Sequence, residues 1–511
     1  MKHIYHLLIV LSLLLSGILR LHAQPVISIN QGEAVDPEKN ARFNSLLGVD
    51  DESFYVLRVK TKGRGTKYFV ESYDKKSFAQ TFSVDLRLDD IPGAQTDPRH
   101  FTVNSIAASG KVYVFFRAYD RTTKERSLMM KTIDKKGNVS SETEMARHST
   151  EFHDENFYMI VSSDRSKLAL ISQVDSRPQQ VNITIYDTRT FKPIREYQLP
   201  QGYKKSGIFA GSYIVHDDGS LYFSFNYLTA KEKVGLALGC IPYNSNEMKA
   251  IELDLSAKKD LYKGLVNFNK SDSTITIAGI FKDEIEWNGK PNDKNKPEKK
   301  AGFFSFKINA TSFTIVKRSE KYFPNHIYDK LAYYTNSSNY PGDKFYTLDQ
   351  ILEVKDARYL IASHSYTVVS DNGSYNVSNE LLVTKINQSG EIEWMNIIPK
   401  FTNSGSVSFN SMVVNDKIHL LFLEHPKSTK AFPEVYEYNR DKFGTVSGVT
   451  GPNAICVVVD ENGKAEKVKF YENKDFCYVP PAQDYLLDGD NGLLIRFIRG
   501  DQEKFGSITI K

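Results

Sequence analysis

Short apolar segments separated by polar turns fill almost the whole chain, and they recur in a constant order. Within each repeat, a tight polar turn precedes a segment that is almost wholly apolar, as at residues 418–423, which is typical of a strand buried on both faces. A later segment alternates, as at Phe82, Val84 and Leu86, and alternation marks a strand with one face in solvent. Each repeat is therefore predicted to contain four strands, A to D, joined by an A–B turn, a B–C loop and a C–D turn.

The C–D turn carries the clearest repeated signal. Asp and Asn suit this place because their side chains bond to the backbone two residues on and tolerate left-handed dihedral angles. A supersecondary unit that recurs at spacings of 53 to 78 residues predicts the blades of a propeller. We therefore expect an all-β chain folded as an eight-bladed β-propeller of four-stranded blades, with seven blades or a pair of β-sandwiches as alternatives. The seven copies of the turn are at Asp74, Asp134, Asp187, Asn244, Asn309, Asn387 and Asp460.

The last repeat has room for only three strands, and the N-terminal part of the chain offers a fourth. Residues 26–29 read Val-Ile-Ser-Ile. We predict that this segment is the outer strand of the final blade, because such a closure removes the open edges of the ring. The predicted units are approximately 41–90, 99–147, 153–200, 205–255, 262–320, 344–399, 405–471 and 477–511.

The N-terminus resembles a secretory signal peptide. Lys2 precedes an apolar run over residues 7–19, and residues 21–23 read as a cleavage site. The run is shorter than the roughly 20 residues needed to span a bilayer, although an uncleaved anchor is the alternative. The expected organisation is a signal peptide at 1–23 and one propeller domain at 24–511, without a membrane span. The expected localisation is exported: periplasmic, at the cell surface or extracellular.

Charge and cysteine content narrow the classes of partner. Loss of residues 1–23 would remove Lys2 and Arg20 and lower the formal charge from +4 to +2. This balance argues against nucleic acid as the partner, since phosphate binding needs a concentrated basic surface.

The three cysteines, Cys240, Cys456 and Cys477, allow at most one disulfide, between Cys456 and Cys477. Three buried thiols that pack as small hydrophobes are the favoured interpretation.

Four long segments interrupt the regular repeats, and all four are expected on one face of the disc. They span residues 282–300, 321–343, 364–379 and 424–453. Long loops on a rigid scaffold often carry function, and aromatic side chains supply contact area with a polar tip. The alternative is that these aromatic residues pack on one another to hold the loops in place. The candidate ligand-binding residues are Trp287, Tyr322, Tyr328, Tyr333, Tyr334, Tyr366, Tyr375, Tyr436 and Tyr438.

Candidate catalytic and metal-binding groups form two weaker sets. At the mouth of the central channel, a carboxylate beside an imidazole could act as a general acid and base. The set there is Arg99, His100, Asp154 and Glu155. Three histidines, His326, His364 and His425, lie in or beside the long segments, but their spacing matches no zinc motif. The chain contains no nucleotide-binding, hydrolase or metalloprotease motif, so no cofactor is expected.

One hairpin carries a family resemblance. Residues 387–394 read Asn-Gln-Ser-Gly-Glu-Ile-Glu-Trp, in which Asn387, Gly390 and Trp394 occupy the key positions of a D-x-x-G-x-x-x-W repeat. This hairpin resembles those of bacterial secreted β-propeller repeat proteins. The resemblance implies a propeller fold and export, and it implies no specific activity.

Two classes of function follow from these observations. The leading hypothesis is an exported, non-enzymatic propeller that binds a glycan, a peptide or an envelope protein through the long loops of units 5 to 7. The alternative is a hydrolase or lyase that acts on an extracellular polymer at the channel mouth. A structural partner in an envelope complex, without a small ligand, is the third possibility.

Overall fold

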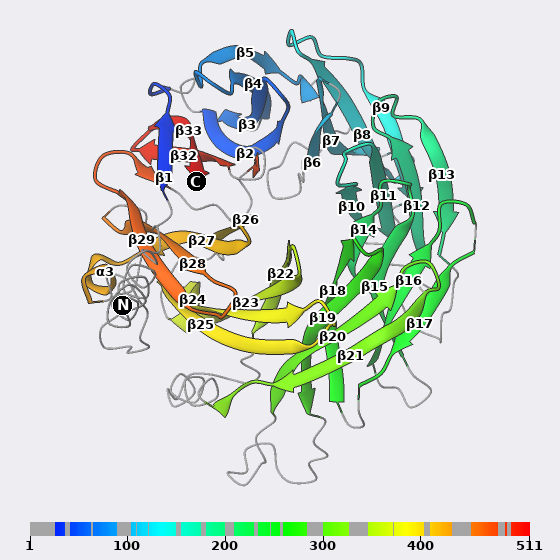
Figure 1. Cartoon of the computed structure of the whole chain (residues 1–511). Coiled ribbons are helices and arrows are strands. Elements are labelled where there is room, and N and C mark those ends of the chain that lie inside the picture. Colours follow the sequence, from blue (N-terminus) through cyan, green and yellow to red (C-terminus); the bar gives the residue numbers. More distant parts are fainter. Residues whose placement is uncertain are drawn as a thin grey trace, which may run out of the picture.

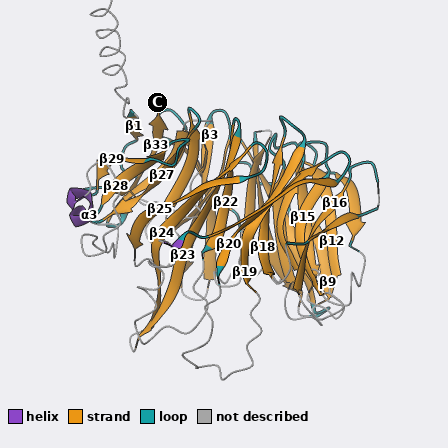
Figure 2. Cartoon of the chain, turned by 60° about the horizontal axis from the view of Figure 1, so that its bottom comes forward, coloured by secondary structure: helices purple, strands orange, loops and turns teal. Residues whose placement is uncertain are grey.

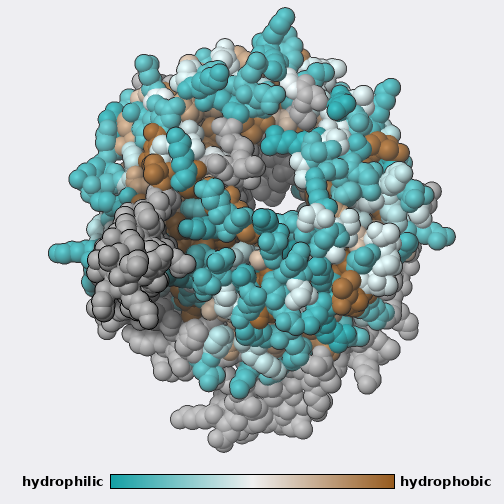
Figure 3. Space-filling view, viewed as in Figure 1, coloured by the Kyte–Doolittle hydropathy of each residue, from teal (hydrophilic) through white to brown (hydrophobic). Residues whose placement is uncertain are grey.

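A computed structural model supplies the fold, and Figure 1 shows it as a ring of β-sheets around a central axis. Seen along that axis, the surface is mainly hydrophilic around a central opening (Figure 3). The structure describes residues 26–35, 41–88 except 63–64, 104–149 except 109 and 121, 155–199 except 175–179, 209–255 except 229–233 and 246, 259–283, 300–325, 346–402 except 371–372, 409–431, 451–478, 486–487 and 492–511.

Eight antiparallel sheets form the ring, and seven of them consist of four consecutive strands paired in chain order. This arrangement is an eight-bladed β-propeller, as the repeats predict. Blades 1 to 3 contain β2 (Ala41–Val49), β3 (Ser53–Lys62), β4 (Gly65–Asp74) and β5 (Gln80–Asp85); β6 (Asn104–Ala108), β7 (Lys111–Asp120), β8 (Glu125–Asp134) and β9 (Thr143–Ser149); and β10 (Glu155–Val161), β11 (Lys167–Val174), β12 (Gln180–Asp187) and β13 (Pro193–Gln198).

The remaining blades follow the same order. Blades 4 and 5 contain β14 (Phe209–Val215), β15 (Leu221–Leu228), β16 (Val234–Ile241) and β17 (Lys249–Leu253), then β18 (Lys259–Asn269), β19 (Thr274–Asp283), β20 (Ala301–Asn309) and β21 (Thr314–Tyr322). Blades 6 and 7 contain β22 (Thr347–Val354), β23 (Ala357–Ser370), β24 (Gly373–Asn387) and β25 (Ile392–Thr402), then β26 (Phe409–Val414), β27 (Lys417–Glu424), the short helix α3 (Pro426–Ala431), β28 (Asn453–Val459) and β29 (Ala465–Glu472).

The N-terminal strand closes the ring, as predicted. The last blade contains β30 (Cys477–Tyr478), β31 (Leu486–Leu487), β32 (Gly492–Arg499) and β33 (Gln502–Ile510), and β1 (Ile27–Gln31) pairs antiparallel with β33. Ile27 lies opposite Ile510 and Ile29 opposite Ile508. Both N-terminal isoleucines pack on the apolar cluster between blades 7 and 8, so the two ends of the described chain share one sheet.

The core lies between neighbouring blades, which explains the all-apolar B strands. Along β27, Leu420 and Phe422 pack in the cluster shared with blade 6, whereas Leu421 and Leu423 pack in the cluster shared with blade 8. Successive side chains of a strand point to opposite faces, so each face of this sheet is buried against one neighbour. The cysteine prediction is also confirmed, because all three thiols are buried and free.

The strand directions sort the connections onto two faces of the disc (Figure 2). The A–B and C–D turns lie on one face, which we call the turn face. The B–C and D–A connections lie on the opposite face, which we call the loop face.

Two expectations about blade 6 are wrong. Residues 364–379 are mostly strand and not a loop, because β23 and β24 continue as one hairpin from the Ala357–Asn387 pair to the Ser370–Gly373 pair. This hairpin projects from the loop face (Figure 2). The predicted end of the unit at residue 399 also falls short, because the outer strand continues past Pro399, which pairs with Glu380, to Thr402. Proline is tolerated there because β25 is the edge strand of its sheet, so no further strand pairs with it on the other side.

Candidate functional site

The loop face over blades 5 and 6 contains the described part of the predicted binding surface. Tyr322 ends β21, the outer strand of blade 5, and 41% of its surface is exposed. Phe323, the next residue, is buried in the core between blades 5 and 6. The backbone around Tyr322 is therefore anchored, while the tyrosine itself reaches solvent.

Three neighbours hold the Tyr322 ring. Its hydroxyl donates a hydrogen bond of 2.7 Å to the Asp283 carboxylate, and its ring meets Phe281 edge to face with 5.1 Å between centroids. The ammonium of Lys259 lies 4.8 Å from the Tyr322 centroid and 4.4 Å from that of Phe281. Edge-to-face and cation–π contacts of this kind each stabilise by roughly 0.5–1.5 kcal/mol. The result is an exposed aromatic group whose orientation is fixed before any ligand arrives.

The hairpin of β23 and β24 carries two further predicted residues. Tyr366 is paired with Val377, and Val368 is paired with Tyr375. Beyond Ser363, β22 no longer pairs with β23. The arm therefore places two predicted aromatic positions beyond the body of blade 6.

A buried polar group lies at the base of this arm. The hydroxyl of Tyr346 donates to Glu380 at 2.7 Å, and His364 Nδ1 lies 3.9 Å from the same carboxylate oxygen. All three side chains are buried. Sequence reasoning had singled out His364 but missed Tyr346 and Glu380, because their pairing depends on a strand register that no motif encodes. The Tyr346–Glu380 hydrogen bond ties β24 to the residue just before β22 at the base of the arm.

The two described members of the histidine set, His364 and His425, lie in different blades. His425 lies before α3, where its ring and carbonyl accept hydrogen bonds from the backbone of the helix, while His364 is buried in blade 6. His326 lies outside the described residues. Across the described part of the chain, no group of three or more His, Cys, Asp and Glu side chains is arranged to hold a metal ion.

A buried ion pair anchors the start of the long segment in blade 7. Lys467 donates to both carboxylate oxygens of Glu424, at 3.1 and 2.9 Å. Thr429 of α3 donates to Glu424 at 2.7 Å and accepts a bond from Asn453 at 3.0 Å. Burial lowers the pKa of Lys467, and Glu424 partly offsets this effect. This pair fixes the helix to the blade, which gives Glu424 a structural role.

Most of the other predicted site residues fall outside the described part. This applies to Trp287, Tyr328, Tyr333, Tyr334, Tyr436 and Tyr438, and to Arg99, His100 and Asp154 of the catalytic alternative. Glu155 is the first residue of β10 and pairs with Val174, at the loop-face end of an inner strand.

Comparisons with known proteins identify no family. No family model and no curated protein matches the chain. Solved structures match weakly. The β-propeller domain of the Trilobed protease from Pyrococcus furiosus is 11% identical over 71% of this chain and 97% of its own, with a TM-score of 0.33. An apocarotenoid oxygenase of Synechocystis is 12% identical over 90% of this chain and 95% of its own, with a TM-score of 0.35. Similarity at this level supports no assignment of activity.

The described residues also include no helix of the length and apolar character required to cross a bilayer.

Proposed function

We propose that the protein is an exported, non-enzymatic propeller that binds a glycan, a peptide or an envelope protein on the loop face of blades 5 to 7. The observation that carries this proposal is the fixed, exposed ring of Tyr322. A tyrosine held in place gives contact area and a polar tip without a large loss of side-chain entropy on binding. The neighbouring arm of blade 6 carries two further predicted positions, Tyr366 and Tyr375, in its paired strands.

A glycan and peptide array probed with the mature chain tests the proposal. We expect Tyr322→Ala to weaken the strongest array signal by about tenfold, as loss of one aromatic anchor of about 1.4 kcal/mol would. Tyr243→Ala is the matched control, because Tyr243 is 60% exposed and follows β16 on the turn face. Its signal should equal that of the unmodified protein.

Two outcomes would count against this function. One is an array without any signal from a folded protein. The other is a signal that falls equally in the two tyrosine variants, which would place the ligand elsewhere.

A further inference from the structure

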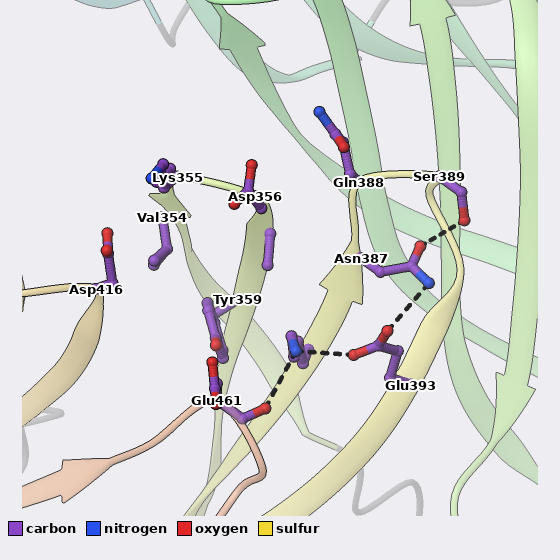
Figure 4. Close-up of a pocket in the computed structure, with 12 residues that line it drawn as sticks. Val354, Lys355, Asp356, Tyr359, Asn387, Gln388, Ser389, Glu393, Asp416 and Glu461 are labelled. Carbon is purple, nitrogen blue, oxygen red and sulfur yellow. Dashed lines mark hydrogen bonds and ion pairs between the residues drawn. The ribbon is translucent and has the colours of Figure 1, made fainter.

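The turn face contains a polar cleft of about 460 Å³ at the joint between blades 6 and 7 (Figure 4). Blade 6 contributes its A–B turn, with Lys355 and Asp356, and its C–D turn at residues 387–389. Blade 7 contributes Asp416 and Glu461 from the corresponding turns. The volume is in the range of small-molecule and side-chain binding sites. The cleft opens on the face opposite to the surface around Tyr322.

Polar contacts within blade 6 and between blades 6 and 7 fix the walls of the cleft. Lys385 pairs with Glu393 at 2.9 Å and donates to the carbonyl of Glu461 at 3.1 Å. The indole of Trp394 donates to the same carbonyl at 3.0 Å, and Asn387 donates to Glu393 at 3.2 Å. The backbone of the blade 7 turn is therefore held against blade 6, while the carboxylate of Glu461 stays available.

Tyr359 lies beneath the cleft. Only 2% of its surface is exposed, and its ring packs 5.8 Å from that of Trp394. It lines the cleft, and its hydroxyl forms no hydrogen bond with any residue that the structure describes. The pKa of Tyr359 is raised to about 12, mainly by burial and, to a smaller extent, by the negative charges of Glu461, Asp460 and Glu393. The buried phenol thus stays protonated and lies in a negative field.

The charge of the lining is unbalanced. Four carboxylates, Asp356, Glu393, Asp416 and Glu461, share the cleft with the two ammonium groups of Lys355 and Lys385. Lys385 and Glu393 neutralise each other. Among the described residues, the other three carboxylates form no ion pair, and Lys355 is the one lining cation left to balance them. The lining therefore attracts a positively charged group.

The remaining walls indicate an organic cation. Val354 and Ala357 line the cleft beside the polar turns, and such apolar surface suits the methylene groups of an amine-bearing chain. We propose that this cleft is a second binding site, which takes an ammonium or guanidinium group on an aliphatic stem, as presented by a lysine or arginine side chain of a peptide. The carboxylates of Asp416 and Glu461 would pair with the cation, and the Tyr359 oxygen would accept one of its hydrogen bonds.

Titration of the full chain with three neutral-backbone probes tests this site. The probes are Nα-acetyl-lysine methylamide, Nα-acetyl-arginine methylamide and the uncharged Nα-acetyl-norleucine methylamide, followed by calorimetry or by chemical-shift changes. We expect both cations to bind and norleucine not to bind. We also expect the affinity to fall as salt rises from about 0.05 to 0.5 M, because salt screens partly exposed charges.

Two isosteric substitutions make the test specific. Asp416→Asn and Glu461→Gln should each weaken cation binding at least fivefold. Asp416 has a φ of +60°, and asparagine tolerates this left-handed conformation. The Glu461 carbonyl contacts do not involve its side chain. Glu391→Gln is the control, since Glu391 lies in the same blade 6 hairpin and pairs with Lys317 outside the cleft.

The result that would overturn the proposal is equal binding of norleucine, no binding of either cation, or unchanged affinity in both substituted proteins. Tyr322→Ala should leave this titration unchanged, so failure of the loop-face function and failure of the cleft are separate outcomes.

Discussion

A buried ionic group joins the first blade to the last, and its disruption has a calculable effect. Arg58 of β3 is fully buried and bonds to Glu71 of β4 and to Glu503 of β33. Tyr73 completes the group, donating to Glu71 at 2.6 Å and accepting from Arg58 at 3.2 Å. Burial opposes the charge of Arg58, but Glu503 and Glu71 outweigh this effect and raise its pKa.

The Arg58→Met substitution keeps an apolar stem but removes the cation between two buried carboxylates. Breaking a buried pair in this way typically destabilises by about 3–5 kcal/mol. The unfolding entropy of a 511-residue chain is about 1 kcal/mol per kelvin, from roughly 2 cal/mol/K per residue. The expected fall in Tm is therefore about 3–5 °C.

Thermal unfolding by differential scanning fluorimetry measures this shift. Lys317→Met is the matched control, because Lys317 pairs with Glu391 at 2.7 Å on the surface and exposed pairs contribute little. Adding Glu71→Gln to Arg58→Met should recover part of the lost stability, since one stranded carboxylate is then neutral. A shift of Arg58→Met no larger than that of the control would refute the reasoning, as would a double variant less stable than the single one.

Three further substitutions test other parts of the ring. Lys400 is 1% exposed, and burial, partly offset by Asp349, lowers its pKa to about 7. Between about pH 7 and 10.5 the unfolded chain therefore binds one proton more than the folded chain at this lysine. The stability of the wild type should rise with pH over this window relative to that of Lys400→Met, as measured by urea titration. His419 is also buried, and burial lowers its pKa to about 4. The wild type should therefore lose stability relative to His419→Gln as pH falls from about 6.5 to 4. Parallel curves of stability against pH for the two proteins would contradict the assignment. Gly463 has a φ of +82°, and an added Cβ would lie 3.0 Å from the Trp394 ring; Gly463→Ala should destabilise by about 1–3 kcal/mol in urea unfolding, and a neutral effect would show that the turn can rearrange.

The blades could be predicted because their physical requirements appear directly in the sequence. A strand buried on both faces needs an unbroken apolar run, and β27 has one whose alternate residues serve two different clusters. The spare segment at residues 26–29 was recognisable because the last repeat lacked an outer strand, and β1 fills that place.

Turn geometry was harder to predict. After Asp74, Asp187 and Asn309, the turn uses a left-handed phenylalanine four residues on, with φ of 58° at Phe78 and 51° at Phe191. Phenylalanine rarely adopts this conformation, so composition gives no warning of it. Packing compensates: Phe191 lies 3.8 Å, centroid to centroid, from Tyr113.

The two proposed sites differ in how far the sequence could indicate them. Tyr322 belonged to a recognisable aromatic-rich segment. The cleft combines turns of two blades. Taken one at a time in the sequence, each of its charged residues is indistinguishable from an ordinary solvent-exposed turn residue. Nothing in the sequence indicates that Trp394 and Lys385 both bind the carbonyl of Glu461. The prediction of a loop at the arm of blade 6 is wrong for a related reason: the strands there are defined by their pairing with each other, which composition does not reveal.

Closure of the ring by β1 holds the blades in the order on which both sites depend, and a cysteine cross-link measures it directly. Ser28 lies opposite Thr509, and antiparallel partners have Cα atoms about 4.5–5.5 Å apart, within the range of a disulfide. In the Ser28→Cys, Thr509→Cys protein, peptide mapping by mass spectrometry under mild oxidation should find the bond between positions 28 and 509. The Ser28→Cys, Ser507→Cys protein, which is offset by two residues, should stay reduced. A folded protein that forms the offset bond as readily, or forms neither, would contradict the closed eight-bladed ring.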